Sequence, residues 1–297
     1  VVLMPVAVNP FYREVVTATT AAQGVKVQLV AYDPASGQTA LTALRAYEGT
    51  QPTAVVIQQP NFFGVLEDVD AITDWAHAQN ALLVASVNPT SLAVLRAPGQ
   101  WGVKGADIVC GEGQPLGVPL SSGGPYFGFL TARMSLVREM PGRIVGRTVD
   151  LDGKPGYTLT LQAREQHIRR AKAKSNICTN QGLLVTAATI YLSLLGPEGL
   201  AQVAANSHAN TRRLVELLGV IPGVAPVFGG ASFHEAVLRL PRPVAPVLEA
   251  LAARGIFGGY DLSARYPELG NALLVCATET KSEAHLIHYR DALAAVL

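Results

Sequence analysis

Short, nearly continuous apolar runs alternate with helical patterns through the first half of the chain, and this alternation constrains the fold more than any other feature. Strands that are apolar on both faces are typical of a parallel sheet covered by helices on both sides. The expected strands lie at 1–4, 25–30, 54–57, 81–87, 108–110 and 126–131, and the expected helices at 10–23, 41–47 and 65–79. The first half therefore predicts an α/β fold with a mostly parallel sheet.

The pattern changes within residues 159–195. A basic helical run at 164–174 contains Glu165 and Arg169 in the favourable i,i+4 order, and the polar pair Ser175-Asn176 interrupts it. An apolar stretch with helical spacing follows at 183–195. A charged helix joined by polar residues to a buried helix indicates a junction between domains or subunits.

The remainder predicts a smaller α+β domain. Helical patterns lie at 199–218, 244–254 and 282–297, and strand patterns at 225–228, 235–240 and 273–277. We predict a large α/β domain over 1–182 and a junction helix with the small α+β domain over 183–297. Because Val1 opens the chain inside an apparent strand, the large domain is predicted to lack its N-terminal part.

Composition excludes several classes of protein. With 49% hydrophobic and 15% charged residues, the 297-residue chain can bury a large core, and a formal charge of +1 argues against charge-driven binding of nucleic acid or membranes. The cysteines at 110, 178 and 276 are far apart, which indicates neither a disulfide framework nor a zinc or other metal site. The run at 183–195 is shorter than the ~20 residues of a membrane span, and no secretory signal leads the chain. A cytoplasmic location is expected.

Several long segments resemble one known family. They read VVIQQPNFFGVLED at 55–68, GADIVCGEGQPLGVPLSSGGPYFGF at 105–129, MPGRIVG at 140–146, AREQHIRRAKAKSNICTNQ at 163–181, LLGPEGL at 194–200 and LLVCATET at 273–280. In this order they resemble the glycine dehydrogenase (decarboxylating) P-protein, and within it subunit 1 of the two-subunit bacterial form, a component of the glycine cleavage system. The resemblance implies the large and small domains of a fold-type-I pyridoxal-phosphate enzyme.

The resemblance also implies where cofactor chemistry should be sought. Such enzymes bind pyridoxal phosphate through a Schiff-base lysine, and a carboxylate holds the pyridine nitrogen protonated. Gln114 stands where the family's catalytic subunit carries the lysine, and Asn88 stands where the carboxylate is sought. The family's phosphate-binding segment would lie upstream of Val1. These pocket-equivalent positions predict no catalytic residue on this chain, although Asn88 could equally begin a turn before Pro89.

The partners follow from the same resemblance. A companion catalytic subunit 2 would hold the pyridoxal phosphate, and the pair would transfer the aminomethyl group of glycine to the lipoyl group of H-protein, releasing carbon dioxide. A basic face of this chain could steer an acidic carrier domain, with a solvated face as the simpler interpretation. The residues predicted to face the interface or the H-protein are Arg164, Arg169, Arg170, Lys172, Lys174, Ser175 and Asn176.

Other interpretations remain open at this point. The chain could be the N-terminal half of a fused single-chain P-protein, a purely structural scaffold subunit, or an independent aminotransferase-like enzyme that uses an unrecognised lysine. The turn at 58–61 follows a parallel strand and could line the pocket or the subunit interface. The turn at 121–125 could offer backbone N–H groups to a phosphate, and His77 is expected to interact with the C-terminus of its helix.

Overall fold

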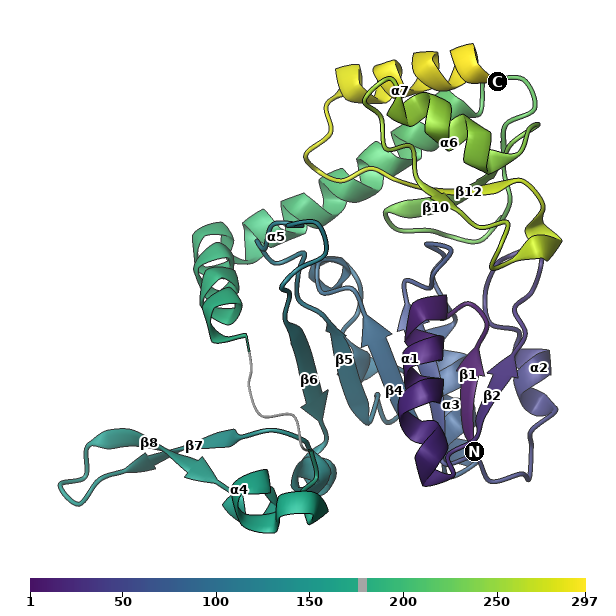
Figure 1. Ribbon diagram of the computed structural model, residues 1–297. Coiled ribbons are helices and arrows are strands. Elements are labelled where there is room, and N and C mark those ends of the chain that lie inside the picture. The colour runs from purple at the N-terminus through teal and green to yellow at the C-terminus, as the bar shows by residue number, and fades with distance from the viewer. Residues whose placement is uncertain (176–180) are drawn as a thin grey trace.

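A six-stranded sheet forms the centre of the larger part of the molecule (Figure 1). The computed structural model describes residues 1–175 and 181–297. The strand order is β2-β1-β3-β4-β5-β6, and all neighbours are parallel except β6, which is antiparallel to β5. The strands are β1 Val2–Pro5, β2 Val27–Val30, β3 Ala54–Gln59, β4 Leu82–Val87, β5 Ile108–Glu112 and β6 Gly128–Ala132. The predicted mostly parallel sheet is confirmed.

The helices of this part follow from local capping and from the handedness of the connections. Asn9 accepts a hydrogen bond from the Phe11 N–H and Pro10 opens α1 (Pro10–Thr20), while Asp68 caps α3 (Val69–Ala78). A short helix, α2 (Leu41–Arg45), lies between β2 and β3. The β1-α1-β2 and β3-α3-β4 units run toward opposite edges of the sheet, so right-handed connections place α1 and α3 on opposite faces.

The two faces of the sheet differ in burial. The α3 face holds a core of thirteen buried residues, including Leu3, Ile57 and Leu83. On the α1 face, three residues form the buried cluster, namely Met4, Val8 and Val56. Because side chains alternate between faces along a strand, both clusters draw on the same strands. The face beneath α1 is therefore the less completely covered of the two.

A smaller antiparallel sheet of order β11-β12-β10-β9 lies beyond the carboxyl ends of the parallel strands (Figure 1). Its elements are β9 Ala225–Pro226, β10 Glu235–Arg239, α6 Val244–Ala252, β11 Tyr260–Asp261, β12 Ala272–Cys276 and α7 Glu283–Val296. Leu238, Leu251 and Leu273 are fully buried in a sixteen-residue core between this sheet and its helices. Together with the second half of α5 these elements are called the small domain below.

The helix α5 (Gly182–Leu218) connects the two parts and is broken at Gly196, whose φ of 63° and ψ of −176° are not helical. The break separates the helices expected at 183–195 and 199–218. The expected burial of the first of these was wrong, because Leu183 and Leu194 are 83% and 82% exposed. Among the described helices, α5 alone has the length and hydropathy of a membrane span. Its continuous part before the break is nevertheless shorter than the ~20 residues required.

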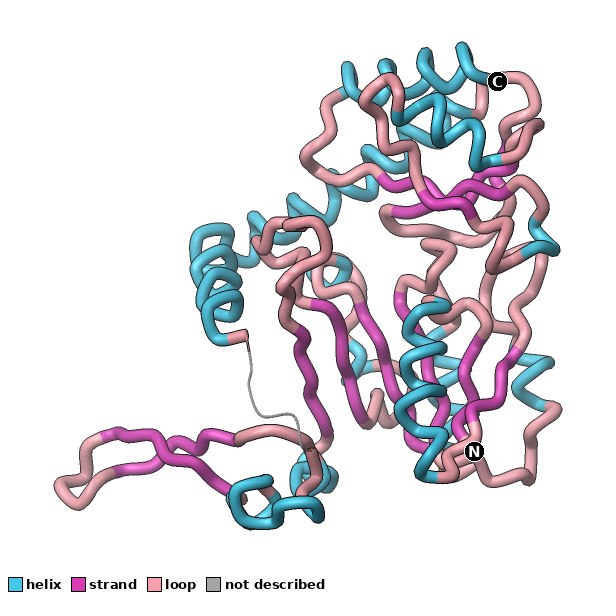
Figure 2. Tube along the Cα trace, in the orientation of Figure 1, coloured by secondary structure: helices cyan, strands magenta, loops and turns pink. Residues whose placement is uncertain are grey.

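A hairpin and a chain of short turns occupy the region between β6 and α5. The strands β7 (Ile144–Val149) and β8 (Pro155–Thr160) pair with each other and project away from the rest of the molecule (Figure 2). The expected basic helix over 164–174 was wrong: α4 covers only Gln166–Arg169, and Arg170 has a positive φ. A helix this short lacks intrinsic stability, and no apolar face supports it here. We call residues 133–174 the basic segment.

Candidate functional site

The candidate site is the cleft between the carboxyl ends of the parallel strands and the small domain. Open α/β sheets place ligands at this edge. Asn88 follows β4 and Glu112 is the last residue of β5, so both lie at this edge of the sheet. Glu235 is the first residue of β10 on the small domain, and its charge acts on Tyr12 of α1 together with that of Glu112. The cleft therefore combines residues that are distant in sequence.

Asn88 uses both ends of its amide within the protein. Its Oδ1 accepts a hydrogen bond from the Thr90 N–H at 2.9 Å, and its Nδ2 donates to Nε2 of His234 at 3.2 Å. This bond ties the large domain to the small domain. Because Nε2 accepts, the His234 proton lies on Nδ1, which is buried and has no partner among the described residues. Burial lowers the pKa of His234 to about 4, so the ring is neutral at physiological pH.

Gln114 is held within its own loop. Its Nε2 donates to the Val118 carbonyl at 2.6 Å, and its backbone N–H donates to the Glu112 carboxylate at 3.1 Å. Since β4 and β5 are parallel neighbours, Gln114 and Asn88 follow their strands at the same edge of the sheet. The two positions predicted from the resemblance therefore lie along one edge, and each has a structural partner of its own.

Two acidic residues, Glu112 and Glu235, act on Tyr12 at this edge of the sheet. Burial raises the pKa of Glu235 to about 7. Burial also raises the pKa of Tyr12 on α1, and the negative charges of Glu112 and Glu235 raise it further. The thiol of Cys276, which pairs with Glu235 across β10 and β12, has its pKa raised by burial to about 12.

Hydrogen bonds from Ser207 and Thr211, which we call the seam, fix the ends of the small-domain strands to α5. The Thr211 hydroxyl bridges the carbonyl groups of His234 and Ala277, each at 2.8 Å, and accepts from the Ala277 N–H. Ser207 donates to the Glu279 carboxylate and accepts from the Glu279 N–H. These bonds leave the position of Glu235 determined by the second half of α5.

The turn after β3 is organised by a buried carboxylate rather than by a ligand. Glu67 accepts hydrogen bonds from the N–H and the hydroxyl of Thr39 and from Nδ2 of Asn61. Gln59 Oε1 in turn accepts from the Glu67 N–H. Burial raises the pKa of Glu67, while these hydrogen bonds act against that rise. Gln59 and Asn61 therefore hold the shape of the turn at 58–61, which the sequence placed at the pocket or an interface.

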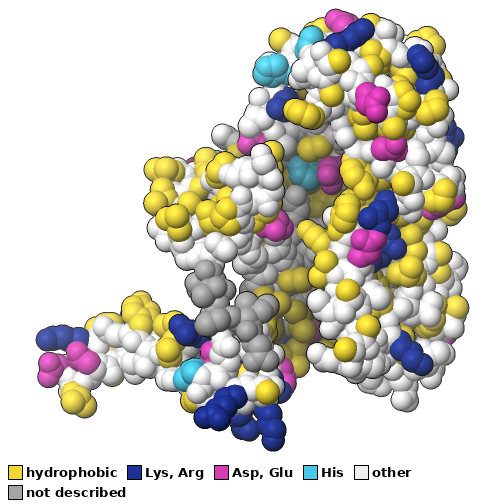
Figure 3. Space-filling model, viewed as in Figure 1, with side chains coloured by type: hydrophobic (Ala, Val, Ile, Leu, Met, Phe, Trp, Pro, Cys, Tyr) yellow, Lys and Arg dark blue, Asp and Glu magenta, His cyan; other side chains and the backbone are white. Residues whose placement is uncertain are grey.

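The basic segment lies away from this cleft. β6 ends beside the beginning of β5, so the chain enters the segment at the amino-terminal edge of the parallel strands. Figure 3 shows lysine and arginine side chains gathered at that end of the molecule, over α4. The segment contains ten basic and four acidic residues, a formal charge of +6, which leaves −5 for the rest of the chain. The structure thus separates the two sets of predicted site residues.

Several charges of the basic segment are already paired. Arg164 forms an ion pair with Glu165, Lys174 forms one with Glu139, and Arg169 donates to the Ala163 carbonyl instead of pairing with Glu165. The predicted Glu165–Arg169 pair was therefore wrong. Arg170 and Lys172 are exposed and point their charges to solvent. Ser175 borders a hollow of about 330 Å³ with Arg143 and Arg164, and Asn176 lies outside the described residues.

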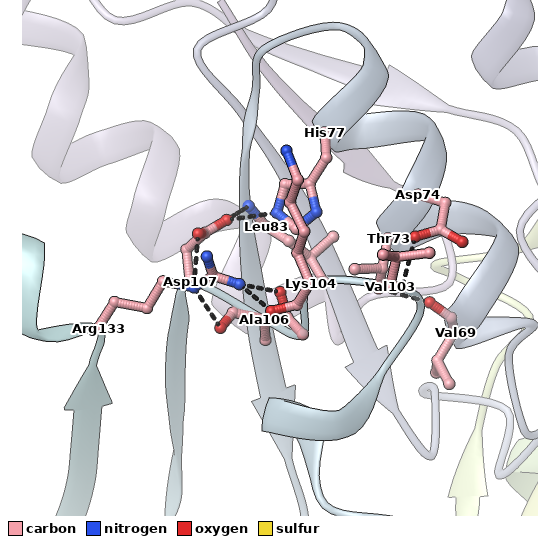
Figure 4. A network of polar contacts seen from close by, with 11 residues as sticks. Val69, Thr73, Asp74, His77, Leu83, Val103, Lys104, Ala106, Asp107 and Arg133 are labelled. Atoms are coloured by element: carbon pink, nitrogen blue, oxygen red, sulfur yellow. Dashed lines mark hydrogen bonds and ion pairs between the residues drawn. The ribbon is translucent and has the colours of Figure 1, made fainter.

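A polar network anchors the start of the basic segment to the sheet (Figure 4). Asp107 accepts from the Leu83 N–H and from Nε2 of His77, both at 2.8 Å, and its other oxygen lies 3.0 Å from Nε of Arg133. Arg133 also donates to the Gly105 carbonyl. The network lies at the amino-terminal edge of the sheet, so His77 has an anchoring role far from the cleft.

The parallel sheet, the small antiparallel domain over its carboxyl ends and the cleft between them define the class of fold-type-I pyridoxal-phosphate enzymes. Solved structures agree with this class. A glycine decarboxylase (P-protein) of the glycine cleavage system, in inhibitor-bound form, is 44% identical with a TM-score of 0.92, covering 100% of this chain and 65% of its own. A sphingosine-1-phosphate lyase of Burkholderia pseudomallei K96243, 16% identical, shares the fold with a TM-score of 0.71 over 99% of this chain and 62% of its own.

The chain belongs to the glycine cleavage system P-protein family, whose model matches residues 1–293. Curated relatives include probable glycine dehydrogenase (decarboxylating) subunit 1 of Thioalkalivibrio sulfidiphilus, 62% identical over 100% of this chain and 65% of the relative. The corresponding protein of Nitrosospira multiformis is 60% identical over 100% of this chain and 66% of its own length. The chain therefore spans about 65% of the length of these relatives. The family predicted from the sequence motifs is confirmed.

The cleft residues do not fit pyridoxal phosphate. At the position predicted for the lysine, Gln114 carries an amide, which forms no Schiff base and is already bonded to Val118. At the position predicted for the carboxylate, the Asn88 amide has its donor on His234 and its acceptor on Thr90. No cofactor chemistry is therefore assigned to this cleft.

Sequence reasoning missed the small-domain side of the cleft. Glu235 opens an apolar strand, EAVLR, and a charge at the first position of such a strand was the available signal. Tyr12 lies one turn into the helix after β1, at the same sheet edge as Asn88, and could have been found by the same strand-end argument. The pairing of His234 with Asn88 had no signal, because 146 residues separate them.

Proposed function

We propose that this chain is a supporting subunit of a glycine decarboxylase, which converts glycine and lipoylated H-protein to carbon dioxide and an aminomethylated lipoyl group. Membership of the P-protein family and relatives described as subunit 1 of glycine dehydrogenase support this proposal. The description as subunit 1 implies a companion subunit. In this assembly the chain shapes the enzyme without carrying out the chemistry itself.

The companion subunit holds the pyridoxal phosphate and supplies the Schiff-base lysine. One observation carries this assignment. At the positions predicted for the carboxylate and the lysine, the chain has Asn88 and Gln114 instead. Both ends of the Asn88 amide and the side-chain nitrogen of Gln114 are already hydrogen-bonded within the chain. The Asn88–His234 bond instead stabilises the contact between the large and small domains. The chain thus presents a fixed cleft wall to its companion.

Borohydride trapping tests the assignment of the cofactor. The purified complex and each subunit alone are mixed with pyridoxal phosphate, reduced, digested and mapped by mass spectrometry. We expect the reduced label on a lysine of the companion. Stoichiometric labelling of a lysine of this chain would overturn the proposal and support the independent-enzyme interpretation. A Gln114→Lys variant, which restores the amine, controls for access to the cleft.

The basic segment is proposed to attract the H-protein through its charge. Its formal charge of +6 and the exposed side chains of Arg170 and Lys172 support a long-range interaction with an acidic carrier. Such steering acts mainly on the association rate and is screened as salt is added. The separation of the segment from the cleft is compatible with this role, because steering requires no contact with the reacting groups.

Replacing Arg170 and Lys172 with alanine should raise the H-protein concentration that half-saturates glycine decarboxylation, by about 3-fold to 10-fold at low salt and less at high salt. The matched control is Lys26→Ala with Arg45→Ala, which removes two exposed charges from the large domain. Steady-state rates of the complex, measured against H-protein concentration at two ionic strengths, give the comparison. Equal saturation curves for both double variants at low salt would refute the role of the segment.

A further inference from the structure

A hollow of about 490 Å³ opens at one end of the small-domain sheet, where β10 begins and β12 ends. Its apolar walls come from the loop after α6, from β12 and from α7, and include Ile256, Leu274 and Leu286. The Tyr289 hydroxyl donates a hydrogen bond to the Gly258 carbonyl, which holds the loop against α7. Three elements of the small domain therefore give the hollow a fixed shape.

The side chain of Glu235 lines this hollow. Its carboxyl group forms no hydrogen bond or ion pair with any of the described residues, and burial alone raises its pKa to about 7. Buried polar groups normally have a partner, so an unpartnered carboxyl group that lines a hollow points to a ligand. A cationic group on that ligand would stabilise the ionised carboxylate.

The rim of the hollow is basic where α7 begins. Lys281 lies just before the helix, and His285 and His288 lie in its first two turns. All three side chains are exposed, and Figure 3 shows histidine side chains beside lysine or arginine side chains over α7. Glu283, in the same turn, is already paired with Arg213. Because the N-terminus of a helix adds partial positive charge, this rim favours an anionic group.

Cys276 lies within reach of both charges. It is the direct partner of Glu235 across β10 and β12, and it also lines the hollow. After burial, which has the largest effect, the charge of Glu235 raises the pKa of the Cys276 thiol further and the charge of Lys281 lowers it. One small molecule can therefore contact the carboxyl group and the basic rim together.

We propose that this hollow binds an α-amino acid with an apolar side chain. The ammonium group of the ligand binds to the Glu235 carboxylate, and its carboxylate binds to Lys281 at the start of α7. The side chain of the ligand packs against Ile256, Leu274 and Leu286. A hollow of this volume accommodates a side chain larger than that of glycine, so the ligand is distinct from the glycine that the complex decarboxylates.

Other classes of ligand match the hollow less well. A metal ion is not supported, because the described residues contain no group of three or more His, Cys, Asp or Glu side chains that could hold one. A phosphate or a simple carboxylate would bind to Lys281 but would leave Glu235 unpartnered. A simple amine would bind to Glu235 but would make no use of the basic rim. A zwitterion satisfies both groups.

Calorimetric titration of the full-length chain in complex with its companion subunit tests the ligand class. The probes are L-leucine, leucinamide, which lacks the carboxylate, and 4-methylpentanoate, which lacks the ammonium group. We expect L-leucine to bind at least about 10-fold more tightly than either analogue, because each analogue leaves one charge of the site unpartnered. Equal affinities for the three probes, or no binding of L-leucine at about 10 mM, would overturn the proposal.

Two variants test the position of the ligand. Glu235→Gln should weaken the binding of L-leucine by about 10-fold to 100-fold and leave that of 4-methylpentanoate unchanged. Lys281→Ala should weaken L-leucine and leave leucinamide unchanged, and Lys26→Ala on the large domain is the matched control. Unchanged L-leucine affinity in both Glu235→Gln and Lys281→Ala would refute the site. Binding is measured without turnover, so this test and the borohydride experiment can fail separately.

Alkylation of Cys276 gives an independent readout in the unmodified complex, should either variant fail to fold. At about ten times its dissociation constant, L-leucine should slow the reaction of Cys276 with iodoacetamide by about 10-fold, because the bound fraction is protected. Peptide mapping by mass spectrometry follows each cysteine separately, and Cys110 should be alkylated at an unchanged rate. Equal rates at Cys276 with and without L-leucine would contradict binding in this hollow.

Discussion

The small domain and the basic segment differ in what their apolar side chains contact. In the small domain, Leu238, Leu251 and Leu273 reach complete burial between a sheet and three helices. In the basic segment, Val145 is 60% exposed and Tyr157 is 76% exposed on a two-stranded hairpin. A hairpin alone is marginally stable in water. The small domain therefore has a packed core of its own, whereas these side chains of the hairpin remain exposed among the described residues.

The largest expected effect is a cavity in the small domain. Leu238→Ala should lower the free energy of unfolding by about 2–5 kcal/mol, because the surrounding core cannot collapse fully around the lost side chain. The matched variant Val145→Ala removes apolar atoms from the exposed hairpin. It should change the free energy of unfolding by less than about 0.5 kcal/mol. Urea titrations of both variants measure the comparison. A comparable loss in Val145→Ala would contradict the description of the hairpin as unsupported.

The next effect is pH-dependent and arises where the small domain faces the cleft. Burial raises the pKa of Glu235 from its ordinary value of 4.5 to about 7, so its stabilising contribution is present below pH 4.5 and lost as pH rises through 7. His234 acts in the opposite direction: its folded pKa of about 4 lies below 6.5, so its contribution is lost as pH falls from 6.5 toward 4.

The variants Glu235→Gln and His234→Gln separate these two contributions. Relative to Glu235→Gln, the unmodified chain should lose about 1–3 kcal/mol of stability between pH 4.5 and 7, at 1.36 kcal/mol per unit of pKa difference. His234→Gln should reduce the loss of stability on the acid side. Unfolding free energies measured every half pH unit test both. Parallel profiles for the unmodified chain and Glu235→Gln would show that Glu235 is solvated.

An effect of similar size concerns the anchor between the sheet and the basic segment. Asp107→Ala leaves the buried Leu83 N–H without its acceptor and removes the partner of His77 and Arg133, at an expected cost of about 1–3 kcal/mol. Asp152→Ala at the hairpin tip, where Asp152 pairs with Lys154 in full exposure, should cost nothing measurable. Equal unfolding free energies for the two variants, by urea titration, would rule out Asp107 as an anchor.

The sequence predicted the fold where burial sets the pattern. The strands of the large sheet were expected within a few residues because apolar runs bounded by helical periodicity have a single interpretation in such a chain. The predictions were wrong for segments whose side chains are exposed. Charges at 164–174 suggested a helix, but without an apolar face only Gln166–Arg169 formed one. Likewise the apolar spacing of 183–195 correctly predicted a helix but could not reveal that Leu183 and Leu194 remain exposed among the described residues.

The candidate site was predictable on one side only. Asn88 and Gln114 follow strands, so their position at the sheet edge follows from topology. Their hydrogen-bond partners do not follow from topology, because the Asn88–His234 contact depends on how α5 places the small domain. The isolation of the basic segment from the cleft was also unpredictable, since it results from β6 running antiparallel to its neighbour and returning the chain to the opposite edge.

The break in α5 at Gly196 has a mechanical consequence. A φ of 63° with a ψ of −176° belongs to a region of backbone space that is essentially restricted to glycine. The angle between the exposed first half of α5 and the second half is thus a property of one residue's dihedral angles. The second half also carries Thr211, which bonds to the carbonyl group beside Glu235. Gly196 therefore sets the angle between the exposed first half and the part of the helix that contacts the small-domain strands. A side chain at position 196 would therefore strain the backbone there, and relief of that strain would change the angle between the two halves of α5.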